Sequence, residues 1–490
     1  MNLVQKIIRS ALVSALLVLA GCADFSGIAP QAKMLVPQAV NTSTQADTAV
    51  FPQQRWWQAF GDTQLDDLIT QAIAHNPSLK VAQSRMLQAQ AAVSVADSVR
   101  YPQVNATAQS TRERLSANSI YPPPLGGSTV SMNSAMVSAS WQFDWFGKQR
   151  AVLEAALGQA RAAQADTQAA QVVLAAGVAQ QYFSLARLQT QQQIKQRLLQ
   201  HSEQHEQLIN QRVAAGLDNA LVQHQSQAAV PQIRRDLAAL DEQVAIARHA
   251  LAVLIGAEPQ VTDQLTAHLP LNLQAAVPAD IPAELLGHRA DVVAARWRVE
   301  SELQSVHEAT AAFYPNINLT AFVGFEAIGL SQWLRADSRT LGAGPAISLP
   351  IFDAGRLRAQ LQGRTAQMDI AIESYNATVL NALREVADKL ASWQALQTQL
   401  QAQMSTMTQL NAAYALALAR YRGGLSNYLV VLDADNAVLQ QHSTLIDLQA
   451  RACDVNAGLM LALGGGYSAP PQVMQLSNET ADEKIAKVSK

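Results

Sequence analysis

The stretch YPNINLTAF, residues 314–322, decides how this sequence of 490 residues folds, because YPQVNATAQ at 101–109 repeats its pattern 213 residues earlier. The match extends upstream at the same offset, where HNPSLKVAQS from His75 aligns with HRADVVAARW from His288. A pattern that returns at a fixed spacing predicts a structural unit that is built twice.

The repeat continues downstream, where the offset becomes 208. FGKQRAV from Phe146 aligns with AGRLRAQ from Ala354, and RVAAGLDNALV from Arg212 aligns with RYRGGLSNYLV from Arg420. Collinear matches with a single change of five residues indicate an internal tandem duplication. Each half is therefore predicted to be one unit of about 200 residues.

The composition is that of uncharged, helix-forming material. Charged residues make up 15% of the chain, against an average of about 25%. The net charge of -3 provides no basic stripe for a phosphate backbone, so nucleic acid is not an expected partner. Cys22 and Cys453, which lie far apart, cannot form a disulfide framework.

Signatures of catalysis and metal binding are missing from the sequence. There is no G-x-S-x-G elbow, no P-loop and no C-x-x-C pair. His201 and His205 could share a helix face, but their order is not H-E-x-x-H and no third ligand is evident. Met404 and Met407 are interpreted as core packing. The sequence therefore predicts no enzyme activity, no cofactor and no metal.

The N-terminus has the pattern of a secretion signal. Lys6 and Arg9 precede an apolar core that is too short to span a bilayer as a mature helix. Its end, LAGC at 19–22, matches the lipobox of bacterial lipoproteins, in which Cys22 would receive a diacylglycerol. Residues 1–21 are thus predicted to be a signal peptide, and an ordinary signal peptide with an incidental cysteine is the alternative. Residues 22–55, rich in Gln, Pro and Thr, are predicted to be a lipidated tether.

Helical and strand periodicities alternate in each half. A helix is predicted from Gln64 to Val99, interrupted near Asn76–Pro77. Partial alternation of apolar and polar residues then predicts a β-hairpin at about 103–146, and a second one at about 316–353. The apolar face is clearest in the second hairpin, in Ile317, Leu319, Ala321, Val323 and Phe325.

Two proline-free regions predict very long helices. A helix from Gly147 to Arg212 would reach about 100 Å and needs a neighbour along its length. A heptad seam for such packing is predicted in the second half. Its members are Val386, Leu390, Trp393, Gln397, Leu400, Met404, Met407, Asn411, Tyr414, Leu418 and Tyr421. Gly216 and Gly424 permit the reversal into a return helix in each half.

Four membrane strands cannot close a barrel, since the smallest single-chain barrels use about eight. Three copies would supply twelve strands, and below them twelve helices. In this order the motifs resemble those of the TolC-like outer-membrane factors, in the NodT-like lipoprotein branch that serves resistance-nodulation-division pumps. The matching pieces are RWWQAFGDTQLDDLI, the two YP-x-x-N strand entries, LPIFDAGRLRA, RYRGGLSNYLVVLDAD and LALGGGY. Thr63 and the stretch 288–291 depart from the family pattern at helix starts.

The resemblance implies a mixed α and β fold: a homotrimeric, 12-stranded outer-membrane β-barrel with four strands per protomer. A long periplasmic α-helical coiled-coil barrel continues it. The implied function is the outer-membrane channel of a tripartite efflux pump, which conducts drugs or other small toxic compounds passively. The implied partners are a periplasmic membrane-fusion adaptor and an inner-membrane transporter of the resistance-nodulation-division type. The implied location is the outer membrane, with a lipid anchor and an extension into the periplasm.

The resemblance also assigns site residues. Asp433 matches a carboxylate of the periplasmic constriction, although a solvated helix carboxylate or a cap is the alternative. Tyr421 matches a tyrosine that helps hold the tip closed, but it also ends the heptad series and could be seam packing. The tips around Gly216, Leu217, Gly424 and Leu425 resemble adaptor-docking sites, with Arg212 and Arg420 placed to cap the helix ends.

The predicted domains are a first repeat at 56–270, a second repeat at 271–467 and a polar tail at 468–490. Two other functions share the architecture. A type I secretion duct would export polypeptide, and a non-conducting trimeric scaffold would need neither alternating strands nor an axial acidic ring. The sequence leaves open the exported compound, the cognate pump, the resting state of the gate and the number of constriction rings.

Overall fold

The computed structural model describes residues 25–35, 52–118, 120–270 and 285–467. The signal peptide 1–21, Cys22 and the tail 468–490 therefore lie outside the described residues. The elements in chain order are η1 (Trp56–Phe60), α2 (Thr63–His75), α3 (Pro77–Ser98), β1 (Gln103–Arg114), β2 (Thr129–Phe143), α4 (Lys148–Ala214), α5 (Ala220–Leu254), η2 (Pro259–Thr262), α6 (Leu285–His288), α7 (Ala290–Ala311), β3 (Asn316–Ile328), η3 (Leu330–Gln332), η4 (Ala336–Ser338), β4 (Arg339–Ser348), α8 (Arg356–Arg422) and α9 (Tyr428–Ala462).

The tandem repeat is confirmed element by element. Helices α3 and α7 are each 22 residues long and start 213 residues apart, as β1 and β3 also do. Helices α4 and α8 are each 67 residues long and α5 and α9 each 35, and both pairs are offset by 208. The five-residue change therefore falls between the start of each first strand and the long helix that follows the hairpin.

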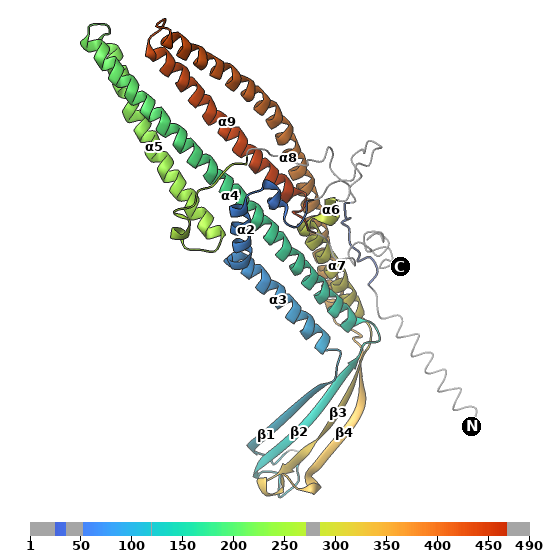
Figure 1. Ribbon diagram of the computed structural model, residues 1–490. Helices are drawn as coiled ribbons and strands as arrows, with labels where there is room; N and C mark the ends of the chain where they lie inside the picture. The colour runs from blue at the N-terminus through green and yellow to red at the C-terminus, as the bar shows by residue number, and fades with distance from the viewer. Residues whose placement is uncertain (1–24, 36–51, 119, 271–284, 468–490) are drawn as a thin grey trace.

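The molecule is strongly elongated. The sheet lies at one end, and the hairpins α4–α5 and α8–α9 extend to the opposite end, where each reverses (Figure 1). Helices α3 and α7 flank the part of α4 nearest the sheet, and α4 also packs against α9 of the second repeat. None of the helices in the described part of the chain is long and apolar enough to cross a membrane.

The four strands form one antiparallel sheet in the order β1-β2-β3-β4. Val137 pairs with Val323, which pairs with Leu341, so these side chains lie on one face. On the opposite face, Ser138 pairs with Phe322 and Ser140 pairs with Thr320. The predicted alternation is thus confirmed: one face is mainly apolar, and the other is mixed and mostly polar.

The heptad seam of α8 is half right. Leu400, Met407 and Tyr414 are partly covered, but Met404 is 63% exposed. At every second position of the predicted seam from Gln397 to Leu418, the residue that is more covered lies one residue earlier. Val386 is buried as predicted, and the other buried positions of this stretch are Leu396, Gln403 and Ala417, each one residue before a predicted member. The prediction was therefore wrong for Gln397, Met404, Asn411 and Tyr421, which are exposed. It was right for Val386, which is buried, and for Leu390, Trp393 and Leu418, which are partly covered. Apolar residues at both phases produced the error, and Gln403 tolerates burial because its Nε2 donates to the carbonyl of Gln441, 2.8 Å away.

The described part of the tether lies against the second repeat as an extended strap, residues 25–35. The backbone N–H groups of Gln31 and Ala32 donate to one carboxylate oxygen of Asp369, at 2.9 and 3.0 Å. Asn376 on α8 accepts from the N–H of Leu35 and donates to the carbonyl of Lys33. The strap is therefore held through its backbone by side chains of one helix.

A run of three glycines after α9 lets the end of the second repeat pack closely against neighbouring segments. Gly464, Gly465 and Gly466 all have positive φ, and a Cβ at each would overlap a neighbouring atom. Beside them the buried guanidinium of Arg289 donates to the carbonyl of Ala462 at 3.0 Å. The LALGGGY motif thus needs glycine for both backbone conformation and close approach.

Candidate functional site

Both helical hairpins end in the same well-ordered reversal. At the first, the N–H of Gly216 donates to the carbonyl of Val213 and that of Leu217 to the carbonyl of Arg212, at 3.0 and 2.9 Å. At the second, the corresponding bonds run from Gly424 to Tyr421 and from Leu425 to Arg420. Both glycines have φ +70°. This is the Schellman pattern, which glycine favours because a left-handed residue is required.

Each reversal exposes a leucine at its end. Leu217 is 64% exposed and Leu425 is 74% exposed. The following helices are capped by the side chains of Asn219 and Asn427, which accept from backbone N–H groups of the first turn. Each tip therefore presents an exposed apolar side chain on a reversal whose backbone groups are hydrogen-bonded.

The capping role expected of the Arg212 side chain is wrong in detail. The carbonyls at the helix end are occupied by backbone N–H groups, and the Nε of Arg212 donates to the carboxylate of Asp218 at 2.6 Å. Ser426 stands at the repeat position of Asp218, so Arg420 has no equivalent acidic neighbour in the sequence there. The two tips thus have the same backbone conformation but differ in the charges of their side chains.

Tyr421 lies near the end of α8 and is 42% exposed. Its ring centroid is 5.2 Å from that of Tyr428, the first residue of α9. The contact joins the two arms of one hairpin. The gate role of Tyr421 stays a prediction, as does its alternative in the seam.

Asp433 and Asp435 on α9 have different surroundings. Asp433 is exposed, whereas the carboxylate of Asp435 faces α4, with Oδ2 3.4 Å from Nδ1 of His201. His205, one turn further along α4, contacts the hydroxyl of Ser226 on α5 instead. The two histidines therefore contact different helices. Of the two carboxylates, Asp433 is the more exposed to solvent.

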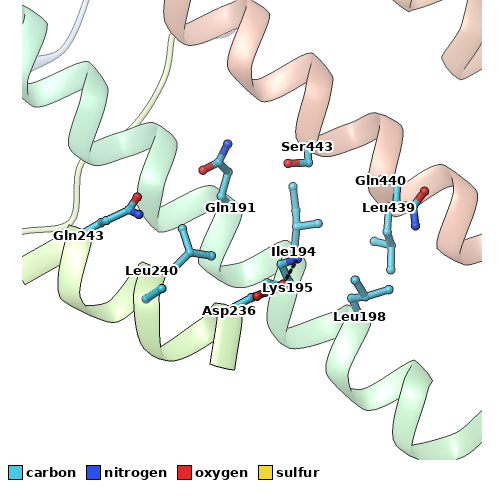
Figure 2. A pocket seen from close by; sticks show the side chains of 11 residues that line it. Gln191, Ile194, Lys195, Leu198, Asp236, Leu240, Gln243, Leu439, Gln440 and Ser443 are labelled. Carbon is cyan, nitrogen blue, oxygen red and sulfur yellow. Dashed lines mark hydrogen bonds and ion pairs between the residues drawn. The ribbon is translucent and has the colours of Figure 1, made fainter. Parts of the chain in front are cut away.

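A cavity of about 440 Å³ lies between α4, α5 and α9, further from the tips (Figure 2). Ile194, Leu198, Leu240 and Leu439 form its apolar part. Lys195 and Asp236 pair across one side, with Nζ 3.3 Å from Oδ2. Sequence reasoning did not find this cavity, because it depends on how three helices diverge rather than on any motif.

The geometry defines the class of protein: a subunit with a membrane-type sheet and paired helical hairpins of equal length, as in an outer-membrane channel. The model of the outer membrane efflux protein family matches residues 68–257 and 281–465. The chain belongs to this family and is an outer-membrane efflux channel that extends into the periplasm.

Individual relatives agree. The chain is 31% identical to the multidrug resistance outer membrane protein MdtP of Escherichia coli K12, over 96% of this chain and 98% of MdtP. It is 34% identical to the fusaric acid resistance protein FusA of Burkholderia cepacia, over 73% and 69% of the two chains. The crystal structure of the outer membrane protein VceC from Vibrio cholerae superposes with a TM-score of 0.77 at 34% identity, covering 85% of this chain and 100% of VceC. The predicted mixed fold, the efflux function and the absence of an enzymatic role are thereby confirmed.

Proposed function

We propose that three copies assemble into a continuous tube and work as the outer-membrane component of a tripartite pump for drugs and other toxic small compounds. The observation that carries this proposal is the pair of equal hairpins on a sheet of only four strands. Such a sheet leaves two open edges, and membrane strands need closed pairing. Three sheets would close a 12-stranded barrel, and six hairpins would form the periplasmic tube.

Within this assembly the conduit performs no chemistry. The mostly polar face of the sheet would line the pore, and the apolar face, with Val137, Val323 and Leu341, would meet lipid. The proposed units are a first repeat at 56–270 and a second at 271–467. The partners are an adaptor and an inner-membrane transporter of the resistance-nodulation-division type, which would supply the energy and the selectivity.

The proposed gate is Asp433. Threefold symmetry would place three of these carboxylates around the axis, and such a ring favours cations and binds multivalent blockers. Its exposure on α9 supports this role, since Asp435 faces α4. Tyr421 would help to hold the tip closed through bonds to the neighbouring hairpin.

Planar-bilayer conductance tests the gate. A multivalent cation added on the periplasmic side should block the wild type and should fail to block Asp433→Ala. Asp454→Ala, on the same helix and 21 residues further from the tip, is the matched control and should remain blocked. An intact trimer that conducts in neither form would contradict the pore, and equal block in both variants would contradict the ring.

We also propose that Cys22 carries the lipid anchor of a NodT-like lipoprotein. The lipobox before Cys22 supports this modification. Metabolic labelling with palmitate should mark the wild type and should be lost in Cys22→Ser. Label that persists in the variant would refute the site.

The tips are the proposed docking surface for the adaptor. Leu217 and Leu425 are exposed at the reversals, and burial of an exposed apolar side chain by a partner is favourable. Single cysteines at these two positions should crosslink to the adaptor in cell envelopes. A cysteine at Val253, equally exposed in the single chain but remote from the tip, should not.

A further inference from the structure

Each connection between the sheet and a flanking helix carries an exposed aromatic residue. Tyr101 lies between α3 and β1, Trp145 and Phe146 between β2 and α4, Tyr314 between α7 and β3, and Phe352 between β4 and α8. Phe352 is 89% exposed and Trp145 is 75% exposed. The rings of Phe146 and Tyr314 stack, with centroids 4.8 Å apart, so one connection of each repeat contacts the other. These five residues are called the aromatic collar.

The collar continues the apolar face of the sheet. The last apolar row of that face contains Phe143, paired with Ile317, which in turn pairs with Ile347. Trp141 lies in the next row, and its ring centroid is 4.4 Å from that of Phe143. Aromatic rings gather where the hydrocarbon of a bilayer gives way to headgroups. The collar therefore has the position and the chemistry of such a boundary.

Basic residues follow the collar on the helical side. Lys148 and Arg150 are the first and third residues of α4, and Arg356 and Arg358 are the first and third residues of α8. The two pairs stand at the same repeat offset of 208. Positive charge in the first turn of a helix opposes the helix dipole, so these residues do not serve the helices that carry them.

Carboxylates already occupy both helix starts. Asp144 accepts from the backbone N–H groups of Gln149 and Arg150, at 3.0 and 2.8 Å. Asp353 accepts from the N–H of Leu357 at 3.0 Å, and its Oδ2 lies 3.8 Å from the guanidinium of Arg356. Across the two helix starts, four cations thus stand with the two acids Asp144 and Asp353 close to the collar.

We propose that Lys148, Arg150, Arg356 and Arg358, beside the aromatic collar, bind the phosphates of anionic phospholipid in the periplasmic leaflet. The inference rests on the outer-membrane channel function, and it adds a lipid-recognition surface. The lipid class follows from charge, because a zwitterionic headgroup would not need the surplus of cations.

The position of the strap is consistent with a bilayer surface at the aromatic collar. Phe25 packs edge-on against Phe313, with centroids 5.7 Å apart, and the guanidinium of Arg358 donates to the carbonyl of Ser26 at 3.3 Å. Three residues of extended chain span at most about 11 Å. A lipid on Cys22 would therefore enter the bilayer close to the collar.

Lipid selection by the full-length trimer tests the cations. The trimer is placed in nanodiscs that contain equal amounts of phosphatidylcholine and phosphatidylglycerol, and the lipids retained after mild extraction are counted by mass spectrometry. The wild type should enrich phosphatidylglycerol. Enrichment should fall in the combined variant K148Q/R150Q/R356Q/R358Q, by at most about fivefold for each cation lost at low salt. R234Q/R235Q on α5, where both side chains are exposed, removes two cations far from the collar and should change nothing.

Fluorescence quenching tests the depth of the collar independently. Brominated lipids should quench Trp145 most when the bromine lies near the headgroup, and Trp145→Phe supplies the background to subtract. Equal phosphatidylglycerol enrichment in the combined variant and wild type, or no lipid quenching of Trp145, would overturn the inference. If the combined variant does not assemble, the wild-type enrichment must still disappear at high salt. Failure of the wild type to conduct would count against the channel function itself.

Discussion

Replacing Gly464 by alanine should destabilise the molecule far more than its size suggests. Gly464 has φ +95°, and an added Cβ would overlap the backbone carbonyl oxygen of His288. A left-handed alanine alone costs about 1–2 kcal/mol. The overlap cannot be relieved by turning a side chain, because the obstructing atom belongs to the backbone. The start of α7 must therefore move away from the end of α9, which loosens the bond from Arg289 to the carbonyl of Ala462.

Gly355 provides a matched control. Its φ is +86°, and a Cβ there would meet nothing within 4 Å. Gly355→Ala should therefore cost only the backbone term of about 1–2 kcal/mol. Gly464→Ala should cost at least about 4 kcal/mol, a range that few single substitutions reach and that is diagnostic of strain or buried overlap.

The comparison can be made by thermal unfolding of the purified trimer. With an unfolding entropy of about 2.1 cal/mol/K per residue, a chain of this length loses about 1 °C in Tm for each kcal/mol. Gly464→Ala should therefore lower Tm by at least about 4 °C and Gly355→Ala by about 1–2 °C. Equal shifts in the two variants would refute the argument from close approach and leave only the backbone conformation.

Three further predictions concern buried groups. Leu396→Ala should cost about 2–5 kcal/mol because the side chain is fully buried, whereas Met404→Ala should cost well under half of that, and equal losses in thermal unfolding would contradict the observed seam. Burial raises the pKa of Glu302, so the stability that its neutral form contributes is present below a pH of about 4.5 and is lost as pH rises through the raised value. Glu302→Gln should accordingly be more stable than wild type at neutral pH and match it in acid, and a gap independent of pH in unfolding curves would refute this. Arg289→Gln should cost about 3 kcal/mol, the lower end of the range for breaking a buried pair, and Glu385→Gln should cost less because Glu385 is 41% exposed; the reverse order of Tm would contradict the role of Arg289.

The repeat and its elements could be predicted from the sequence because their signals are local. The return of YP at 101 and 314 marks the passage from helix to strand in both halves, and the two offsets reappear in the starts of strands and helices. Alternation identified the apolar face of β3, since a strand exposes one residue in two to each side. Glycines at 216 and 424 located the reversals because a left-handed residue is needed there.

What the sequence could not settle was the choice between neighbouring helix faces. Leu396 and Gln397 both continue a spacing of three and four residues, and only the packing of the folded molecule shows that Leu396 is the buried one. The partner of Arg212 depended on the backbone N–H groups that already occupy the helix end. The hydrogen bonds of the strap to Asp369 and Asn376 join residues more than 330 positions apart, so no local pattern could reveal them. The roles proposed for Asp433 and Tyr421 depend on contacts between copies around an axis, and such contacts leave no pattern in the sequence of one chain.

The equal lengths of the paired helices fix the distance that both hairpins of a protomer span. Because α4 and α8 have 67 residues each, and α5 and α9 have 35 each, both hairpins of a protomer can end at one height. An insertion of one heptad would lengthen a helix by about 10.5 Å. If it occurred in one hairpin alone, three tips of a trimer would project beyond the other three, and a partner would lose half of its contacts. Insertions or deletions should therefore occur together in all four helices α4, α5, α8 and α9, so that the two halves keep the same length across the periplasm.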